Sequence, residues 1–181
     1  LISFDELPST QADVTGVPTG FTELDKMTSG LHGGELIIVA ARPSMGKTAF
    51  SLNLATHMAL RAKKTVAYFS VEMAKESVMM RLLAGESKIS MGEIRTGRIQ
   101  DASWPKLIQA AGAISEAPLF IDDTAGISPF EIRARCRRLK ATHGLDCIMI
   151  DYLQMMDLKQ KVESRERAVS EISKNLKGIA K

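Results

Sequence analysis

Aromatic residues, long apolar runs and a strong charge of one sign are all scarce in this sequence. Only 5% of the 181 residues are aromatic. No uninterrupted apolar stretch approaches the roughly 20 residues that a membrane-spanning helix needs, and residues 1–10 lack the basic and then apolar pattern of a secretory signal. We therefore predict a cytoplasmic protein with no membrane partner. The 45% hydrophobic and 25% charged residues are the balance typical of an α/β protein.

Cysteine and histidine are also too few to predict a metal centre. Cys136 and Cys147 have no Cys or His nearby at metal-ligand spacing, and the three histidines are scattered along the chain. The net charge of +3 is too small to predict nucleic-acid binding unless the basic residues cluster. Because the chain starts without Met and ends within a helical pattern, we expect it to be a piece of a longer protein.

The length favours one domain preceded by a short arm. Residues 1–15 are predicted to form a linker or N-terminal arm, because Pro8, Gly16, Pro18 and Gly20 occur within the first 20 residues among polar residues with little periodicity. Residues 16–181 are predicted to form the folded core, since this length buries a substantial core but does not divide comfortably into two.

Short apolar segments alternate with helical patterns from residue 35 onward. The predicted strands cover residues 35–40, 65–71, 118–121 and 146–150. The predicted helices cover residues 21–27, 47–62, 75–86, 102–116, 128–142 and 163 onward, with capping boxes at residues 90–93 and 128–131. After Glu35 the first strand is apolar, which is typical of a buried parallel strand. The alternation predicts a parallel sheet with helices on both faces.

The segment between the first predicted strand and its helix resembles a phosphate-binding loop. It matches the pattern G-x-x-x-x-G-K-[ST] except for alanine at the first position, and consists of Ala41, Arg42, Pro43, Ser44, Met45, Gly46, Lys47 and Thr48. Backbone N–H groups in such a loop, together with the positive end of the next helix, bind phosphates. We expect Lys47 to meet the β- and γ-phosphates and the Thr48 hydroxyl to coordinate Mg²⁺.

Carboxylates at the ends of the predicted strands are candidates for the remaining chemistry. Ligands of parallel sheets bind at the carboxyl ends of the strands, where Asp151 competes with Asp122 and Asp123 for the position next to Mg²⁺. The longer apolar strand before Asp151 favours that residue. Glu72 ends the second strand at the same edge and is positioned to polarise a water molecule, although a solvated acid at a helix start is an equal alternative.

One predicted helix is strongly basic and carries Arg133, Arg135, Arg137, Arg138 and Lys140. The residues opposite these charges are apolar, so a solvated helix face or a subunit contact is the first interpretation. A patch that follows a nucleic-acid backbone is the second, and it is disfavoured because no aromatic residues interleave with the charges.

Four segments of the chain resemble the DnaB family of replicative DNA helicases. They are residues 15–25, residues 41–48, Ser70-Val-Glu-Met73 and Asp151-Tyr-Leu-Gln154, and Arg42-Pro43 inside the loop is a specific mark of the family. The resemblance implies a RecA-like P-loop NTPase fold that binds ATP and Mg²⁺. It also implies that Glu72 is the catalytic base, with Lys47 as a second catalytic residue, and that Asp151 is the Walker B acid on the Mg²⁺ side.

The same resemblance implies partners for the full-length protein and further functional elements of the family beyond residue 181. Identical subunits are expected to form a hexameric ring on single-stranded DNA, with a helicase loader and primase as partners of the full-length protein. The family's polar sensor, arginine finger and main DNA-contacting loops are expected beyond residue 181. We therefore expect slow hydrolysis by this chain alone, because an arginine supplied by a neighbour raises the rate by about 10³ or more. An ATPase of the RecA or KaiC type, which assembles on DNA or protein without unwinding, remains an alternative, as does a module that senses nucleotide.

Overall fold

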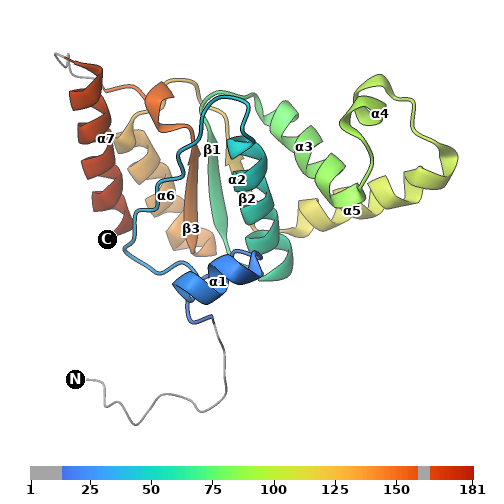
Figure 1. Ribbon diagram of the computed structural model, residues 1–181, viewed down its shortest axis with the longest axis horizontal. Coiled ribbons are helices and arrows are strands. Elements are labelled where there is room, and N and C mark those ends of the chain that lie inside the picture. The colour runs from blue at the N-terminus through green and yellow to red at the C-terminus, as the bar shows by residue number, and fades with distance from the viewer. Residues whose placement is uncertain (1–13, 159–163) are drawn as a thin grey trace, which may run out of the picture.

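A computed structural model describes residues 14–158 and 164–181, and these contain a three-stranded parallel sheet (Figure 1). Its strands are β1 (Val66–Ser70), β2 (Leu119–Asp122) and β3 (Cys147–Asp151), in the order β2-β1-β3. All residues of the central strand β1 are buried. Ser70 pairs with Asp151 and Phe69 with Asp122, so the carboxyl ends of all three strands meet at one edge of the sheet.

Helices connect the strands and cover both faces of the sheet. They are α1 (Thr22–Thr28), α2 (Lys47–Thr56), α3 (Lys75–Ser87), α4 (Met91–Thr96), α5 (Trp104–Glu116), α6 (Pro129–His143) and α7 (Arg165–Ala180). A π-helical turn over His57–Arg61 extends α2, and short 3₁₀ turns cover Asp101–Ser103 and Leu153–Met155. Both predicted capping boxes are present, at the starts of α4 and α6. None of the helices in the described ranges is long and apolar enough to span a bilayer.

Alternate residues of β1 enter two separate hydrophobic cores. Val66 and Tyr68 pack with α2, α3 and α5 on one face, whereas Ala67 and Phe69 pack with α6 and α7 on the other. Figure 1 shows α2 in front of the sheet and α6 behind it, while α3, α4 and α5 extend away on one side. Because side chains of a strand point alternately to opposite faces, this division confirms the predicted sheet with helices on both faces.

The predicted strand over residues 35–40 is wrong. In the described part of the chain, no backbone hydrogen bond joins residues 36–40 to β3 or to another strand. The exposed fractions of Ile37, Ile38 and Val39 are 51%, 66% and 46%. An apolar, β-branched composition favours a strand, but a strand forms only where a neighbour supplies matching N–H and C=O groups. The segment instead runs from α1 to the phosphate loop beside the sheet (Figure 1).

A buried carboxylate organises the segment around α1. Asp25 is 7% exposed and accepts hydrogen bonds from the Thr19 amide (2.8 Å), the Thr19 hydroxyl (2.7 Å) and the Gly20 amide (3.1 Å). Burial opposes the charge on Asp25, but these hydrogen bonds outweigh it and lower the pKa of the carboxyl below its ordinary value. The segment is held against α2, where the Phe21 and Phe50 ring centroids are 5.1 Å apart.

Two predictions lie partly outside the described residues. Residues 1–13 of the predicted arm and residue 163 at the predicted start of the last helix are not described. The described part of that helix, α7, begins at Arg165.

Candidate nucleotide-binding site

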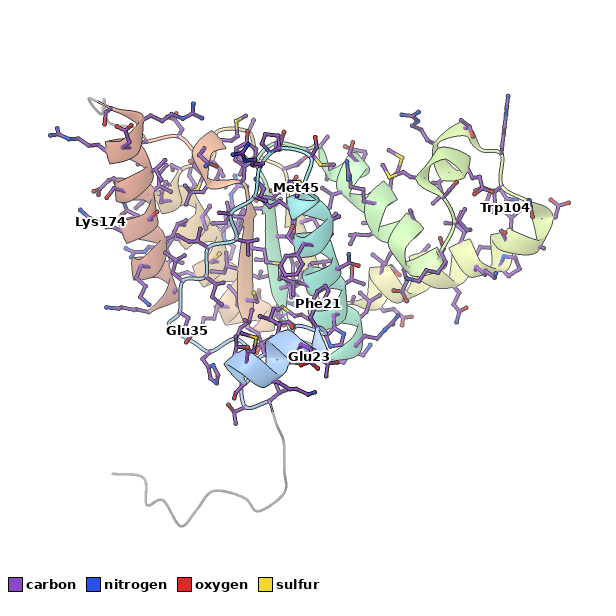
Figure 2. All side chains as sticks on the ribbon, in the orientation of Figure 1. Phe21, Glu23, Glu35, Met45, Trp104 and Lys174 are labelled. Carbon is purple, nitrogen blue, oxygen red and sulfur yellow. The ribbon has the colours of Figure 1, made fainter. Side chains whose placement is uncertain are left out.

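The phosphate loop has the backbone geometry of an anion-binding turn. Ser44 and Gly46 have φ values of +65° and +85°, in the left-handed region that favours glycine. A Cβ atom built on Gly46 would meet no atom within 4 Å, so the space in front of this residue is open. Met45, which lies beside the start of α2 in Figure 2, is 74% exposed.

The start of α2 has free hydrogen-bond donors. Gly46 is its N-cap, no side chain caps the helix, and no acidic residue lies in its first turn. The first N–H groups of a helix have no partner within the helix, and the helix dipole is positive at this end. A phosphate group would satisfy both conditions, which is what the sequence pattern over residues 41–48 predicts.

Asp151, the last residue of β3, lies against the first turn of α2. Its exposed fraction is 5%. The Thr48 hydroxyl donates a hydrogen bond of 2.6 Å to Asp151 Oδ2, and the Lys47 ammonium group lies 3.8 Å from Oδ1. The structure therefore brings together three of the predicted site residues, although they lie about a hundred positions apart in the chain.

Two tyrosines complete the surroundings of this carboxylate. The Lys47 ammonium group lies 4.0 Å from the centroid of the Tyr152 ring, a cation–π contact that helps to orient the lysine. The Tyr68 hydroxyl reaches Asp151 Oδ2 at 3.4 Å from within the sheet. Burial, with a smaller contribution from the Asp151 charge, raises the pKa of the Tyr68 phenol far above its ordinary value, so the phenol keeps its proton.

A serine on α2 extends this polar layer. The Ser51 hydroxyl lies 2.9 Å from the Tyr68 hydroxyl and 3.0 Å from the Thr48 carbonyl oxygen. Neither Ser51 nor Tyr68 was predicted from the sequence to belong to the site. The available signal was a tyrosine inside an otherwise apolar strand, because a buried phenol needs a hydrogen-bond partner.

The structure places Glu72 at the same sheet edge, without a hydrogen bond or ion pair to the other described site residues. Its side chain is exposed and forms no hydrogen bond or ion pair with a described residue. The backbone around it is held firmly. The Val71 amide donates to the Asp151 carbonyl oxygen at 2.8 Å, and the Ser70 hydroxyl donates to the Met73 carbonyl oxygen at 2.7 Å.

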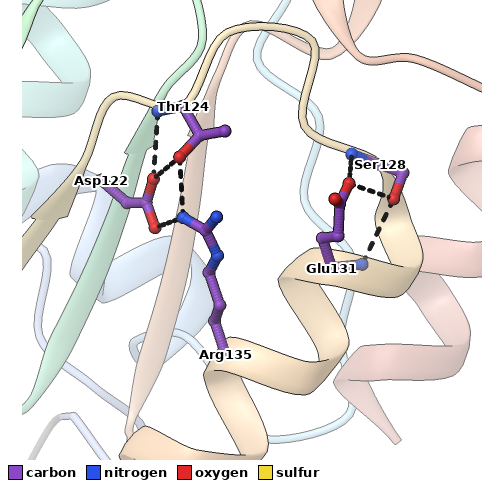
Figure 3. A network of polar contacts seen from close by, with 5 residues as sticks. All are labelled: Asp122, Thr124, Ser128, Glu131 and Arg135. Atoms are coloured by element: carbon purple, nitrogen blue, oxygen red, sulfur yellow. Dashed lines mark hydrogen bonds and ion pairs between the residues drawn. The ribbon is translucent and has the colours of Figure 1, made fainter.

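The competing acids at the end of β2 have local structural partners. Asp122 accepts hydrogen bonds from the Thr124 amide (3.0 Å), the Thr124 hydroxyl (2.7 Å) and the Arg135 guanidinium group (Figure 3). Partial burial opposes the charge on Asp122, but these contacts outweigh it and lower the pKa of the carboxyl below its ordinary value. Asp123 accepts a hydrogen bond of 3.0 Å from the Lys75 amide at the start of α3. Neither carboxylate contacts the phosphate loop in the described hydrogen bonds.

Some of the basic side chains of α6 form contacts within the molecule. Arg135 pairs with Asp122, and Arg133 donates a hydrogen bond of 3.1 Å to the Gly178 carbonyl oxygen in α7. Arg137, Arg138 and Lys140 are exposed. Two of the five cations therefore connect α6 to its neighbours in the fold, and the other three face outward.

The donor atoms near Asp151 suit a hard cation that also binds phosphates. The described residues contain no group of three or more His, Cys, Asp and Glu side chains that could hold a metal by themselves. The Thr48 hydroxyl and the Asp151 carboxylate offer two oxygen donors that already lie 2.6 Å apart. Mg²⁺ is typically held by one or two protein oxygens together with water and substrate phosphates, so the residues present fit that ion.

The family model and the similar proteins of known function point to one family. The family model described as DnaB-like helicase C terminal domain matches residues 16–181. The chain is 48% identical over 180 residues to the replicative DNA helicase DnaC of Bacillus subtilis (strain 168), covering 99% of this chain and 40% of that protein. It therefore spans less than half the length of that relative.

Solved structures agree at the level of the fold. One solved ATPase domain superposes with a TM-score of 0.92 at 38% identity, covering 98% of this chain and 63% of that chain. A DnaB-like replicative helicase, described with its interactions with primase, superposes with a TM-score of 0.91 at 38% identity, covering 98% of this chain and 43% of that chain. The predicted RecA-like α/β fold of a P-loop NTPase is thereby confirmed, and the chain belongs to the DnaB-like helicase C terminal domain family.

Proposed function

We propose that this chain is the ATP-hydrolysing motor domain of a replicative DNA helicase. In the complete protein, hydrolysis at the subunit interfaces of a hexameric ring would drive movement along single-stranded DNA and unwinding of duplex at the replication fork. The observation that carries the proposal is the meeting of Lys47 and Thr48 with Asp151 at the carboxyl edge of a parallel sheet. The replicative helicases to which the chain is similar support it.

Residues 41–48 would bind the triphosphate of ATP. The uncapped N–H groups at the start of α2 would donate hydrogen bonds to the phosphate oxygens. Lys47, which contacts Asp151 and Tyr152, would bind the β- and γ-phosphates, where its charge offsets that of the phosphate oxygens. The positive φ at Gly46 exposes the backbone there, and the absence of a Cβ atom lets the phosphates approach.

Thr48 and Asp151 would hold Mg²⁺ through oxygen atoms. A bound Mg²⁺ ion neutralises charge that develops on the phosphate oxygens. Asp151 keeps the Thr48 hydroxyl oriented toward the end of β3, since the two groups are already hydrogen-bonded.

Glu72 would act as the catalytic base. Its carboxylate, two residues beyond the end of β1, would accept a proton from a water molecule that attacks the γ-phosphate. Its exposure leaves the side chain free to turn toward a nucleotide, while the bonds of Val71 and Ser70 fix the backbone from which it projects.

The proposed partners follow from the relatives. Identical subunits and single-stranded DNA are the partners of a ring helicase, and a helicase loader and primase are proposed for the complete protein. A DnaB-like relative is described with its interactions with primase. A replicative DNA helicase like the relative from Bacillus subtilis would work in the cytoplasm.

Phosphate release measured with and without single-stranded DNA tests the proposal. We expect the 181-residue chain to bind ATP and to hydrolyse it slowly, because hydrolysis is proposed to need a neighbouring subunit. Unwinding of a forked duplex by the complete protein would separate a helicase from an ATPase that assembles without unwinding. Absence of nucleotide binding would contradict the motor function, and rapid DNA-stimulated turnover by isolated monomers would contradict the dependence on a neighbour.

A further inference from the structure

The geometry points to Tyr68 and Ser51 as positioning residues for Asp151. They form a pair of hydroxyl groups beneath the carboxylate, and they act on Mg²⁺ binding through it. This inference rests on the proposed function, in which Asp151 serves the Mg²⁺ ion that accompanies ATP.

The pair joins three elements of the fold at one point. Tyr68 lies on β1 and is 1% exposed. Ser51 lies on α2, three residues after Thr48, so both side chains occur on the same side of the helix. The two hydroxyl groups are 2.9 Å apart, and Tyr68 continues to Asp151 on β3 at 3.4 Å. A continuous polar path therefore runs from α2 through β1 to the end of β3.

The number of hydroxyl protons determines whether Tyr68 can donate a hydrogen bond to Asp151. Each hydroxyl group has one proton, and the acceptors in reach are the Thr48 carbonyl oxygen, the other hydroxyl group and the Asp151 carboxylate. When Ser51 donates to Tyr68 instead of to the Thr48 carbonyl oxygen, the Tyr68 proton is free to bind Asp151 Oδ2. The negative charge of Asp151 favours that arrangement, because hydrogen bonds to charged acceptors are the stronger ones.

The other partners of Asp151 have a second task in the proposed function, whereas this pair does not. Thr48 and Lys47 would both serve the nucleotide and its Mg²⁺ ion. Tyr68 belongs to the core below Asp151, and Ser51 bonds to it there. A carboxylate that is 5% exposed has little access to water and requires protein donors to orient it. Tyr68 supplies one that is independent of the nucleotide, and its longer distance makes it the weaker donor when compared with Thr48.

The test compares nucleotide binding with and without Mg²⁺ in matched variants. Y68F removes one hydroxyl group and keeps the ring, and S51A removes its partner. S87A is the control, because Ser87 is also a buried hydroxyl (4% exposed) but bonds to Leu83 within α3. A fluorescent ATP analogue is titrated in EDTA and over a series of Mg²⁺ concentrations, and thermal unfolding is recorded for each variant.

We expect Y68F to leave the affinity in EDTA within about twofold of wild type and to raise the Mg²⁺ concentration for half-maximal tightening by roughly three- to tenfold, the factor of one net hydrogen bond. S51A should also raise this Mg²⁺ concentration, but by a smaller factor. The double variant should equal Y68F, because Ser51 acts through Tyr68. S87A should lower only the thermal midpoint.

Two outcomes would overturn the inference. If Y68F and S87A lower the thermal midpoint alike and both keep the wild-type Mg²⁺ dependence, the pair is structural only. If Y68F does not fold, S51A takes its place in the comparison with S87A, since it removes only one small hydroxyl group. Wild-type Mg²⁺ dependence in S51A would then show that the pair is structural only. A wild-type chain that binds nucleotide equally with and without Mg²⁺ would overturn the proposed role of Asp151 as well, which distinguishes that failure from the first.

Discussion

Asp151 ends β3 and Glu72 lies just beyond the end of the neighbouring strand β1, yet the surroundings of these two carboxylates at one edge of the sheet differ. Asp151 is 5% exposed and contacts Thr48, Lys47 and Tyr68. Glu72 lies two residues beyond Ser70, the residue paired with Asp151, and is exposed without a described partner. The contrast indicates that the residues proposed to bind phosphate and Mg²⁺ are arranged by the chain itself, whereas the proposed base is held only through its backbone. Substitutions should therefore separate binding from hydrolysis.

The largest expected effect is that of E72Q on turnover. Loss of a general base lowers the rate by about 10² to 10⁴, while nucleotide affinity should stay within about twofold, because Glu72 is exposed and has no hydrogen bond or ion pair to the other described site residues. Single-turnover phosphate release and equilibrium binding measure the two quantities. E76Q, which changes an acidic residue in the first turn of α3, is the control. Equal turnover in E72Q and E76Q would remove Glu72 from the mechanism.

K47A should weaken binding instead. We expect about 10- to 100-fold lower affinity for an ATP analogue, since a charge-assisted hydrogen bond to phosphate contributes roughly 1.5 to 3 kcal/mol. Calorimetric titration measures the change, with K106A at an exposed position of α5 as the control. If K47A and K106A bound the ATP analogue with the same affinity, the proposed role of Lys47 in nucleotide binding would be contradicted.

D25N should affect folding and spare the site. The hydrogen bonds from Thr19 and Gly20 lower the Asp25 pKa, so its stabilisation is complete above the ordinary pKa and is lost as the pH falls through the lower folded-state value. We expect D25N to lower the free energy of unfolding by about 1 to 2 kcal/mol at neutral pH, and the loss of stability in acid should be shallower than in wild type. Urea unfolding at several pH values tests this. If the free energy of unfolding fell with acid in the same way in D25N and wild type, the proposed contribution of the Asp25 carboxylate to stability would be contradicted.

The smallest expected effect is that of I38T. Ile38 is 66% exposed, so the free energy of unfolding should change by less than about 0.5 kcal/mol. V66A at a fully buried position of β1 is the comparison and should cost more than about 1 kcal/mol. A large loss in I38T would restore the predicted buried strand over residues 35–40.

The sequence predicts best what short-range signals determine. The capping boxes at Ser90 and Ser128 require only the residue three positions later, and both form. The phosphate loop was predicted from the sequence pattern of residues 41–48, and the acid at the end of β3 was predicted from its strand-end position. The failed strand over residues 35–40 depends on a pairing partner that composition does not reveal.

The support beneath Asp151 was not predictable for a related reason. Ser51 and Tyr68 are 17 positions apart, and their contact exists only because α2 crosses β1 at one register. The isolation of Glu72 is equally invisible in the sequence, where it occurs as a strand-end acid like Asp151. Long-range packing therefore decides which of several similar carboxylates contacts Lys47 and Thr48.

The most direct test of the account is calorimetric titration of an ATP analogue into wild type and D151N, with Mg²⁺ and with EDTA. The account predicts that Mg²⁺ tightens binding to wild type and that D151N binds in EDTA like wild type but loses most of this tightening. If Mg²⁺ tightens binding equally in both proteins, or if wild type binds no nucleotide, the arrangement of Lys47, Thr48 and Asp151 is not a site for nucleotide and Mg²⁺.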